Sequence, residues 1–427
     1  MSDSRPREKL APDTRPGPVV PHAAAIPADV LHSIAEQVGT PAYVYDARAI
    51  DAGIGRWIDA VGDPTRISFA AKANTNLAVL SRLETSGIGA EVATPGELAR
   101  ARKAGFPLPR IVFGGVPKST EAVRDGIRFG VGMIVLQSDL EVGAALAHGS
   151  ESPNGPVPVG LRVRPGITAG AHPSLETGRT DAKFGFSPER VPEIWQRLSA
   201  DPDLAPRTLA FHLGSGLDSV EPYQQALALL LDLTGMLDGC GAPVRELDVG
   251  GGLGIDYASW SDPEPRDLVR RLTEDLAGMS AELMYEPGRS VVARAGVLLT
   301  RVLYLRDQRD NPAVVCDAGH TDFARHALYG AQHAILPVDG ELSGDPTVQV
   351  LGPTCESGDV LGTGRRLHDT RPGDLLQLRD AGAYGFVMAS NYNSRPRPPE
   401  VLVDGSSWQV VRQRESLEDL WRGEEIP

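Results

Sequence analysis

Residues 246–254 read Glu-Leu-Asp-Val-Gly-Gly-Gly-Leu-Gly, and this stretch is the starting point for predicting the fold. A short apolar run with strand character, Glu246–Val249, passes directly into a glycine-rich turn. Glycine backbone can approach an anion closely and point N–H groups at it, so the turn is a candidate phosphate site. For a glycine triplet taken alone, a tight turn without any ligand is the competing interpretation.

Three other strand-like runs also end in residues that can carry chemistry. They lead into Ala71-Lys72-Ala73-Asn74, Phe211-His212-Leu213-Gly214-Ser215 and Glu286-Pro287-Gly288-Arg289. Each is weak evidence alone, because a lysine at a strand end is usually solvated and a lone histidine is usually a hydrogen-bonded core residue. Barrel enzymes place their chemistry at the carboxyl ends of the strands, so four such ends together favour a barrel.

The middle of the chain contains eight strand-like runs separated by seven segments with helical periodicity. Two of the helix starts have the spacing of a capping box, at Thr94–Glu97 and Ser138–Glu141. This alternation predicts a (β/α)8 barrel of the TIM type, with a doubly wound open sheet as the structural alternative. The predicted strands are Ile67–Ala71, Gly89–Val92, Ile111–Phe113, Met133–Leu136, Val159–Val163, Thr208–His212, Glu246–Val249 and Glu282–Glu286.

After about residue 295 the pattern changes to strands without long helices between them, separated by turn signals such as Arg371-Pro372-Gly373-Asp374. We therefore expect an α/β plus β chain, in which a β-sandwich or β-barrel domain follows the barrel. The expected divisions are a disordered arm over 1–25, a strand and helix over 26–48 that pack with the C-terminal β domain, the barrel over 49–292, and the β domain over 293–427. The C-terminal strands are predicted at Val297–Tyr304, Ala313–Cys316, Thr347–Val350, Leu375–Leu378, Glu400–Val403 and Trp408–Arg412.

Composition excludes several classes of function. The 427 residues carry a formal net charge of −14, which argues against general nucleic-acid binding. No apolar run reaches the roughly 18 residues that cross a bilayer, and the first 25 residues lack the apolar core of a secretory signal. The three cysteines are far apart, and the histidines show no metal-ligand spacing, so we expect a cytoplasmic protein with no metal site.

The strand-end residues together suggest a phosphate site beside a reactive amine. A lysine amine forms Schiff bases with carbonyls, and pyridoxal phosphate is the cofactor that has both a carbonyl and a phosphate. Lys72 is the candidate amine, and Ser215 and Arg289 could join the glycines at the phosphate. The ring nitrogen needs a nearby carboxylate, for which Glu286 is the candidate, while His212 could stack on the ring.

These motifs belong to a collinear series that spans most of the chain, from Thr40-Pro41-Ala42-Tyr43-Val44-Tyr45 to Glu400–Gly405. The series resembles the fold-type III pyridoxal-phosphate-dependent decarboxylases, and among them the diaminopimelate decarboxylases. Besides the four strand ends, it includes His172-Pro173, Thr177-Gly178, Lys183-Phe184-Gly185, Ala327–Ala331, Cys355–Asp359, Asp380–Gly385 and Ser390–Pro396.

The resemblance implies decarboxylation of meso-2,6-diaminopimelate to L-lysine and CO2 by a homodimer with shared active sites. It implies that Lys72 holds pyridoxal phosphate, His212 stacks on its ring and Glu286 pairs with the ring nitrogen. Its phosphate would lie among Ser215, Gly250, Gly251, Gly252 and the Pro287, Gly288 and Arg289 segment. Implied substrate contacts are Arg289, Arg325 and Tyr329 at a carboxylate, Glu356 at the distal amine, Cys355 of the other subunit as proton donor, and Tyr384 at both cofactor and substrate.

Two further hypotheses remain beside this one. Three segments depart from the family pattern, at Gly114–Lys118, Ala324–Ala327 and Leu175–Thr177, and the last two lie close to substrate-facing positions. A related decarboxylase of another amino acid in secondary metabolism would fit these two departures. A catalytically inactive homologue that regulates a partner is the other hypothesis. The presence of Lys72, Glu286, Cys355 and Tyr384 speaks against it.

Overall fold

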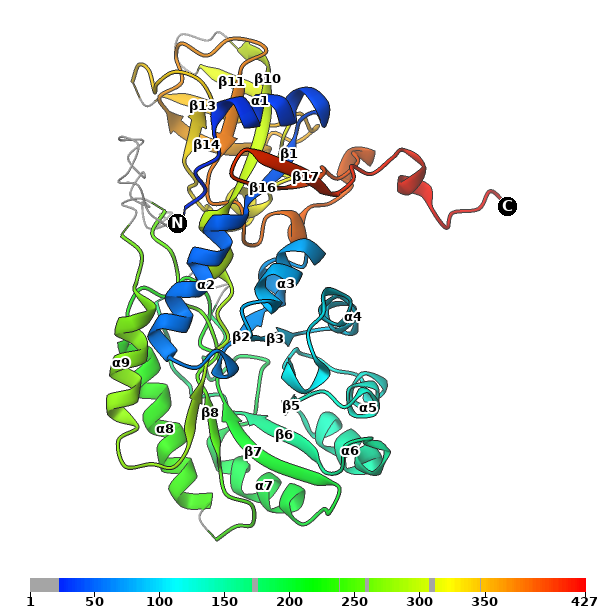
Figure 1. Ribbon diagram of the computed structural model, residues 1–427, viewed down its shortest axis with the longest axis vertical. Helices are drawn as coiled ribbons and strands as arrows, with labels where there is room; N and C mark the ends of the chain where they lie inside the picture. Colours follow the sequence, from blue (N-terminus) through cyan, green and yellow to red (C-terminus); the bar gives the residue numbers. More distant parts are fainter. Residues whose placement is uncertain (1–22, 171–175, 238, 258–260, 307–311, 346) are drawn as a thin grey trace, which may run out of the picture. The chain divides into compact units, whose positions relative to one another are not determined.

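The computed structural model describes residues 23–170, 176–237, 239–257, 261–306, 312–345 and 347–427 (Figure 1). Most of the predicted arm over 1–25 and the motif residues His172-Pro173 lie outside the described residues. The chain divides into two compact units. The barrel unit comprises Ile50–Ile255 and Asp262–Val292, and the β unit comprises the chain up to Ala49, Asp256–Ser261 and Ala293–Pro427.

The barrel unit is built on eight strands, each parallel to the next, in the order in which they follow along the chain. A parallel bridge between Ile67 and Tyr285 joins the last strand to the first, and the Ser68 N–H donates to the Tyr285 carbonyl at 2.9 Å. The predicted (β/α)8 barrel is therefore confirmed, and the open-sheet alternative is wrong. The strands are β2 (Ser68–Ala70), β3 (Gly89–Val92), β4 (Ile111–Phe113), β5 (Met133–Leu136), β6 (Val157–Arg162), β7 (Leu204–Ala210), β8 (Glu246–Asp248) and β9 (Glu282–Met284).

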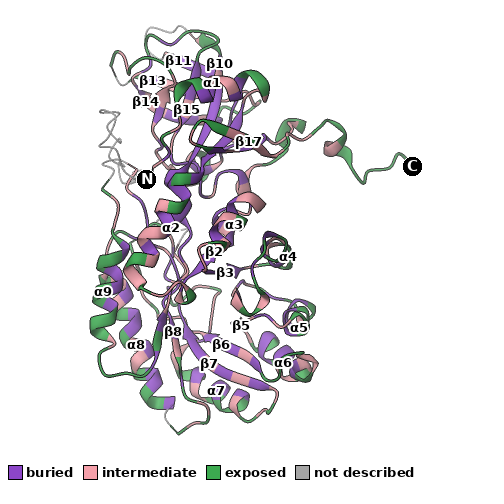
Figure 2. Ribbon diagram, in the orientation of Figure 1, coloured by how far each residue is buried: buried purple, intermediate pink, exposed green. Residues whose placement is uncertain are grey.

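Within the described residues, seven helices connect these strands, and Figure 2 shows that they turn exposed residues outward while the strands are largely buried. The Thr94 hydroxyl accepts from the Glu97 N–H at 3.1 Å, and the Glu97 carboxylate accepts from the Ala93 N–H, so the predicted cap forms one residue wider than a capping box. The helices are α3 (Leu77–Glu84), α4 (Pro95–Ala104), α5 (Thr120–Phe129), α6 (Asp139–His148), α7 (Val191–Ser199), α8 (Glu221–Leu237) and α9 (Pro265–Asp275).

The β unit contains a nine-stranded, mostly antiparallel sheet, which confirms the predicted β domain. Its first strand, β1 (Ala42–Asp46), pairs with β10 and β16, which come from the C-terminal part of the chain. The other strands are β10 (Gly296–Arg306), β11 (Ala313–Cys316), β12 (Ile335–Pro337), β13 (Val348–Leu351), β14 (Val360–Arg365), β15 (Leu375–Leu378), β16 (Glu400–Asp404) and β17 (Ser407–Arg412). Strands β12 and β14 were not predicted.

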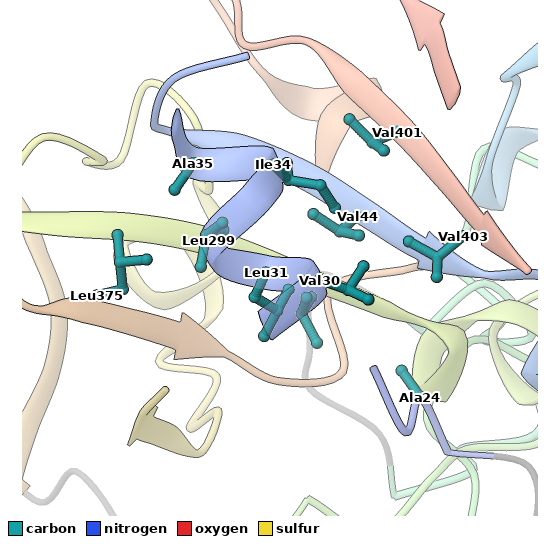
Figure 3. Close-up of a cluster of buried hydrophobic side chains, with 11 residues drawn as sticks. Ala24, Val30, Leu31, Ile34, Ala35, Val44, Leu299, Leu375, Val401 and Val403 are labelled. Atoms are coloured by element: carbon teal, nitrogen blue, oxygen red, sulfur yellow. The ribbon is translucent and has the colours of Figure 1, made fainter. Parts of the chain in front are cut away.

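Helix α1 (Ala28–Gln37) covers one face of this sheet (Figure 3). Its Leu31 and Ile34 are buried against Val44, Leu299 and Val401, which lie on three different strands. The apolar residues of α1 lie one turn apart, so one side of the helix faces the sheet and the other faces solvent. Three further helices in the described residues are α2 (Ala47–Val61), which begins in the β unit and continues in the barrel unit, and the short α10 (Arg289–Val292) and α11 (Arg325–Tyr329). Among the described residues, no helix combines the length and apolar character needed to cross a membrane.

Candidate active site

Lys72 follows β2 in a short 3-10 turn, Ala71–Ala73, whose two alanines are buried. Its Nζ lies 3.0 Å from Oε2 of Glu91, a nearly fully buried side chain on β3. The Lys72 side chain itself is 37% exposed, so it can be reached from outside while its amine is held by a fixed carboxylate. The barrel closure and the pairing of β2 with β3 place these two groups side by side.

A cavity of about 280 Å³ lies at the carboxyl ends of the barrel strands. Lys72, His212 and Glu286, three of the predicted site residues, line it together. Glu91 and Arg162 also line it, so the cavity is walled by charged groups of both signs. The structure therefore brings these three strand ends together at one rim, as the sequence predicted.

His212 follows β7 and is neutral in this environment. Burial, together with the positive charges of Lys72 and Arg162, holds its pKa well below the ordinary value. Its Nδ1 accepts from the Gly251 N–H at 3.3 Å, so the ring proton is on Nε2. The Thr177 hydroxyl donates to the His212 carbonyl at 2.8 Å and fixes the backbone at this point.

Glu286 follows β9, and its carboxyl group shares a proton with Asp248 on β8. Burial and the negative charges of Asp248 and Glu91 raise the pKa of Glu286 well above its usual range. Burial also raises the pKa of Asp248 to about 6. The Gly250 N–H donates to this carboxylate at 2.8 Å, which lowers the pKa but does not offset the effect of burial. Glu286 is the protonated member of the pair, and Asp248 is the acceptor.

The glycine run after β8 is required by close backbone contacts. A Cβ added to Gly251 would lie 2.1 Å from the Glu286 carbonyl oxygen, and one added to Gly252 would lie 2.5 Å from the Gly214 carbonyl oxygen. The N–H groups of Gly216 and Leu217 both donate to the Gly252 carbonyl at 2.9 Å. The loops after β7 and β8 therefore meet backbone to backbone and form one glycine cradle, with no room between them for a side chain.

Ser215 and Arg289 meet at this cradle. The Arg289 side chain is buried, and its Nη2 donates to the Ser215 hydroxyl at 2.9 Å. A hydroxyl and a guanidinium beside glycine backbone are a suitable donor set for a phosphate. Pro287 and Gly288 are buried between Glu286 and Arg289, and the Pro287 carbonyl accepts from the Ala70 N–H at 2.9 Å.

Three charged residues of the cavity region escaped the sequence analysis: Glu91, Arg162 and Asp248. Each occupies a buried barrel strand, and a charge within such a run is the signal that could have found it. Arg162 Nη1 donates to Gln137 at 3.3 Å, and its guanidinium lies 4.9 Å from the centre of the Phe184 ring. Its Nη2 is buried without a hydrogen-bond partner among the described residues, as expected of a group that faces a ligand site.

The remaining predicted residues belong to the β unit. Arg325 begins α11 and is 4% exposed, with Nε 3.2 Å from Nε2 of His333 and Nη2 3.3 Å from the Tyr257 hydroxyl. Tyr329, at the other end of α11, is half-buried. Tyr384 is half-buried and has a φ of 55°, a backbone conformation that non-glycine residues adopt mainly where the surroundings enforce it.

Cys355 and Glu356 are exposed on the loop between β13 and β14. The Cys355 N–H donates to Asn393 Oδ1 at 3.0 Å, and the Tyr392 hydroxyl donates to Glu356 Oε1 at 2.6 Å. The buried carboxylate of Asp359 accepts from the Thr354 N–H at 2.9 Å and holds the base of the loop. The loop is therefore ordered while its cysteine and glutamate face outward.

Comparison with known proteins relates both units to one family. Residues 47–293 match the family model for the pyridoxal binding domain of pyridoxal-dependent decarboxylases. The chain is 40% identical to diaminopimelate decarboxylase of Pseudomonas fluorescens over 93% of this chain and 95% of that protein. It superposes with a TM-score of 0.87 and 34% identity on the crystal structure of diaminopimelate decarboxylase from Helicobacter pylori complexed with L-lysine, covering 92% of this chain and 98% of that one.

A more distant match shows the fold alone. The lysine/ornithine decarboxylase from Vibrio vulnificus, complexed with putrescine, has a TM-score of 0.76 at 22% identity, over 88% of this chain and 98% of that one.

Proposed function

The chain belongs to the pyridoxal-dependent decarboxylases, and from this premise we propose that it decarboxylates meso-2,6-diaminopimelate to L-lysine and CO2. The observation that carries the proposal is the 40% identity to a diaminopimelate decarboxylase over 93% of the chain, which includes both units. The reaction would be the last step of lysine biosynthesis, as the resemblance in sequence implied.

The barrel cavity suits pyridoxal phosphate. Lys72 supplies an accessible amine, Glu286 supplies a buried carboxyl, and a glycine cradle whose backbone contacts leave no room for side chains lies beside Ser215 and Arg289. We assign the cradle, with Gly250, Gly251, Gly252, Pro287 and Gly288, to the phosphate group. When bound, the cofactor supplies an electron sink for the negative charge left on carbon as CO2 departs.

The carboxyl pair would keep the cofactor's ring nitrogen protonated. We assign Glu286 to this nitrogen, because its carboxyl group carries the proton of the pair, which it would give to the ring nitrogen while remaining beside it as the carboxylate. His212 would lie on the ring face, and as a neutral group it would add no charge there. Glu91 would hold the Lys72 side chain as an ammonium group once the substrate amine has replaced it at the cofactor.

The β-unit residues would select and protonate the substrate. A second carboxylate is bound best by guanidinium and hydroxyl groups, and we assign it to Arg289, Arg325 and Tyr329. Glu356 would bind the distal ammonium group, and Tyr384 would contact both cofactor and substrate. The Cys355 thiol would give its proton to the carbon from which CO2 has left.

We propose a homodimer in which Cys355 and Glu356 of one subunit complete the site of the other. The exposure of both side chains on an ordered loop supports this arrangement. The three cysteines are free thiols, which suits a reducing cytoplasm.

The proposal is tested by incubating purified protein and pyridoxal phosphate with meso-diaminopimelate and measuring L-lysine and CO2. L-lysine, L-ornithine and L-arginine are compared as substrates in the same assay. We expect strong preference for diaminopimelate. Faster turnover of a monocarboxylic amino acid would show that the chain is a related decarboxylase, and absence of turnover with every substrate would contradict the proposal altogether.

The shared site is tested by mixing Lys72→Ala with Cys355→Ala subunits after dissociation. Each variant alone should be nearly inactive, while random reassociation should restore roughly a quarter of native activity, because half of the dimers then hold one intact site. No recovery in a mixture shown to exchange subunits would contradict the shared arrangement.

A further inference from the structure

The guanidinium of Arg325 is held from two sides within the β unit. Its Nε donates to His333 Nε2 at 3.2 Å, and its Nη2 donates to the Tyr257 hydroxyl at 3.3 Å. The guanidinium carbon also lies 5.6 Å from the centre of the Tyr257 ring. Arg325 is 4% exposed, so water could not replace these hydrogen bonds if the guanidinium turned away from its partners.

The partners of His333 define which of its ring nitrogens carries the proton. Nδ1 lies 2.9 Å from the Arg379 carbonyl oxygen, which can only accept, so Nδ1 carries the proton. Nε2 faces the N–H of an arginine, which can only donate, so Nε2 is the acceptor. His333 thus links the Arg379 backbone to Arg325, and only its neutral Nδ1–H form satisfies both bonds.

The His333 ring is also fixed by packing. It is 1% exposed, lies 4.5 Å from the Tyr257 ring centre, and meets Phe323 edge-on at 4.7 Å. Imidazole between two aromatic rings cannot turn without losing these contacts. The orientation of the Nε2 lone pair, and with it the plane of the guanidinium, is therefore set by the fold.

We infer that His333 is a positioning residue that orients Arg325 for the second carboxylate of the substrate. Because His333 bonds Nε and the Tyr257 hydroxyl bonds Nη2 on the same side, a carboxylate would approach the far end of the guanidinium. This arrangement would strengthen the binding of a diamine that has a carboxylate at one end. It would not change the binding of a diamine that lacks this carboxylate. The inference rests on the proposed role of Arg325 and adds the residue that makes this arginine selective.

The test measures binding of two ligands to the cofactor-loaded enzyme by calorimetry. L-lysine and cadaverine differ only by one carboxylate, so their affinity ratio isolates its recognition. His333→Phe keeps the ring contacts and removes both nitrogens, while His333→Gln keeps one donor and one acceptor. Arg325→Ala and the double variant Arg325→Ala/His333→Phe complete the set.

We expect His333→Phe to weaken L-lysine binding by about tenfold or more and to leave cadaverine binding within twofold. The KM for meso-diaminopimelate should rise by a similar factor at nearly unchanged kcat, and His333→Gln should recover most of the loss. The double variant should bind L-lysine no more weakly than Arg325→Ala, because His333 acts only through Arg325.

Equal weakening of both ligands, a loss confined to kcat, or additive losses in the double variant would overturn the inference. If Arg325→Ala leaves the L-lysine to cadaverine ratio unchanged, the proposed role of Arg325 fails, which is a separate result. If His333→Phe does not yield folded, cofactor-loaded protein, His333→Met removes the same nitrogens and is judged by the same ratio.

Discussion

The barrel cavity and the Cys355 loop represent opposite ways of presenting reactive groups. In the barrel unit, charged side chains are paired with buried partners, as in Lys72 with Glu91 and Glu286 with Asp248. In the β unit, Cys355 and Glu356 are exposed, and mainly the backbone around them is held in place. In the first region, the charges themselves are fixed by their partners. In the second, the loop backbone is fixed but the reactive side chains are exposed.

This difference separates cofactor chemistry from substrate chemistry. A buried, paired charge has a shifted pKa and costs free energy to disturb, so barrel variants should alter the cofactor and the stability. An exposed residue on an ordered loop contributes little to stability, so loop variants should alter kinetics alone. Four predictions test this division, beginning with the largest effect.

Lys72→Ala should abolish both the characteristic absorbance of the bound cofactor and turnover, with a loss on the order of a thousandfold or more. Spectra and steady-state rates measure the two effects. The matched control is Lys103→Ala, since Lys103 is exposed on α4. A Lys72 variant with native absorbance and rate would remove the barrel cavity as the reactive site.

Cys355→Ala should slow turnover by about a hundredfold or more, because the proton donor is lost, and should leave cofactor absorbance unchanged. Melting temperature should stay within the error of the measurement, since the side chain is exposed. Cys240→Ala provides the comparison for loss of a thiol elsewhere. Loss of the cofactor from the Cys355 variant would break the division between the two regions.

Asp248→Asn should change how the stability of the cofactor-free protein depends on pH. The pKa of Asp248 is raised to about 6 in the folded state, against about 4 when unfolded, so the folded state binds more protons between these values. Stability is therefore fully present below pH about 4 and is lost as pH rises toward 6, by on the order of 2 kcal/mol.

The asparagine variant should lack the part of this slope that Asp248 contributes, as measured by denaturant unfolding at several pH values, while the raised pKa of Glu286 retains its own part. Asp232→Asn, at an exposed position on α8, should keep it. An unchanged slope in the Asp248 variant would show that the carboxyl pair is not the buried proton-sharing pair described above.

Thr94→Ala should have the smallest effect, a loss of about 1 kcal/mol in barrel stability from removal of the α4 cap. Turnover and cofactor binding should stay near native, because the cap reaches the cavity lining only through the backbone N–H of Ala93. Thr94→Ser retains the oxygen and should retain the stability. A kinetic defect in Thr94→Ala would mean that the helix cap and the cavity are coupled.

The barrel strands could be predicted because buried parallel strands are short apolar runs, and all eight expected runs overlap a strand. Two strands of the β unit could not be predicted in this way. Strand β12 is three residues long and ends in Pro337, and β14 contains Gly362 and Gly364, which have low strand propensity.

The site shows the same limit. Motif residues at strand ends could be read from the sequence, because a lysine or a glycine triplet after an apolar run is unusual. Glu91 and Asp248 were missed although each is a charge within a buried run, because the sequence alone does not reveal which residues of a short strand point into the barrel. His333 was missed for a different reason: its role depends on Arg325 and Arg379, which only tertiary structure brings to it.

Closure of the barrel has a consequence for biosynthesis of the protein. The strand that precedes Lys72 is joined to the strand that precedes Glu286, through the Ser68 N–H and the Tyr285 carbonyl. These partners are far apart along the chain, and contacts of such long separation form slowly. The ribosome must therefore synthesise the chain beyond Tyr285 before Lys72 and Glu286 can come together, so we expect pyridoxal phosphate to bind only after the whole barrel has been translated.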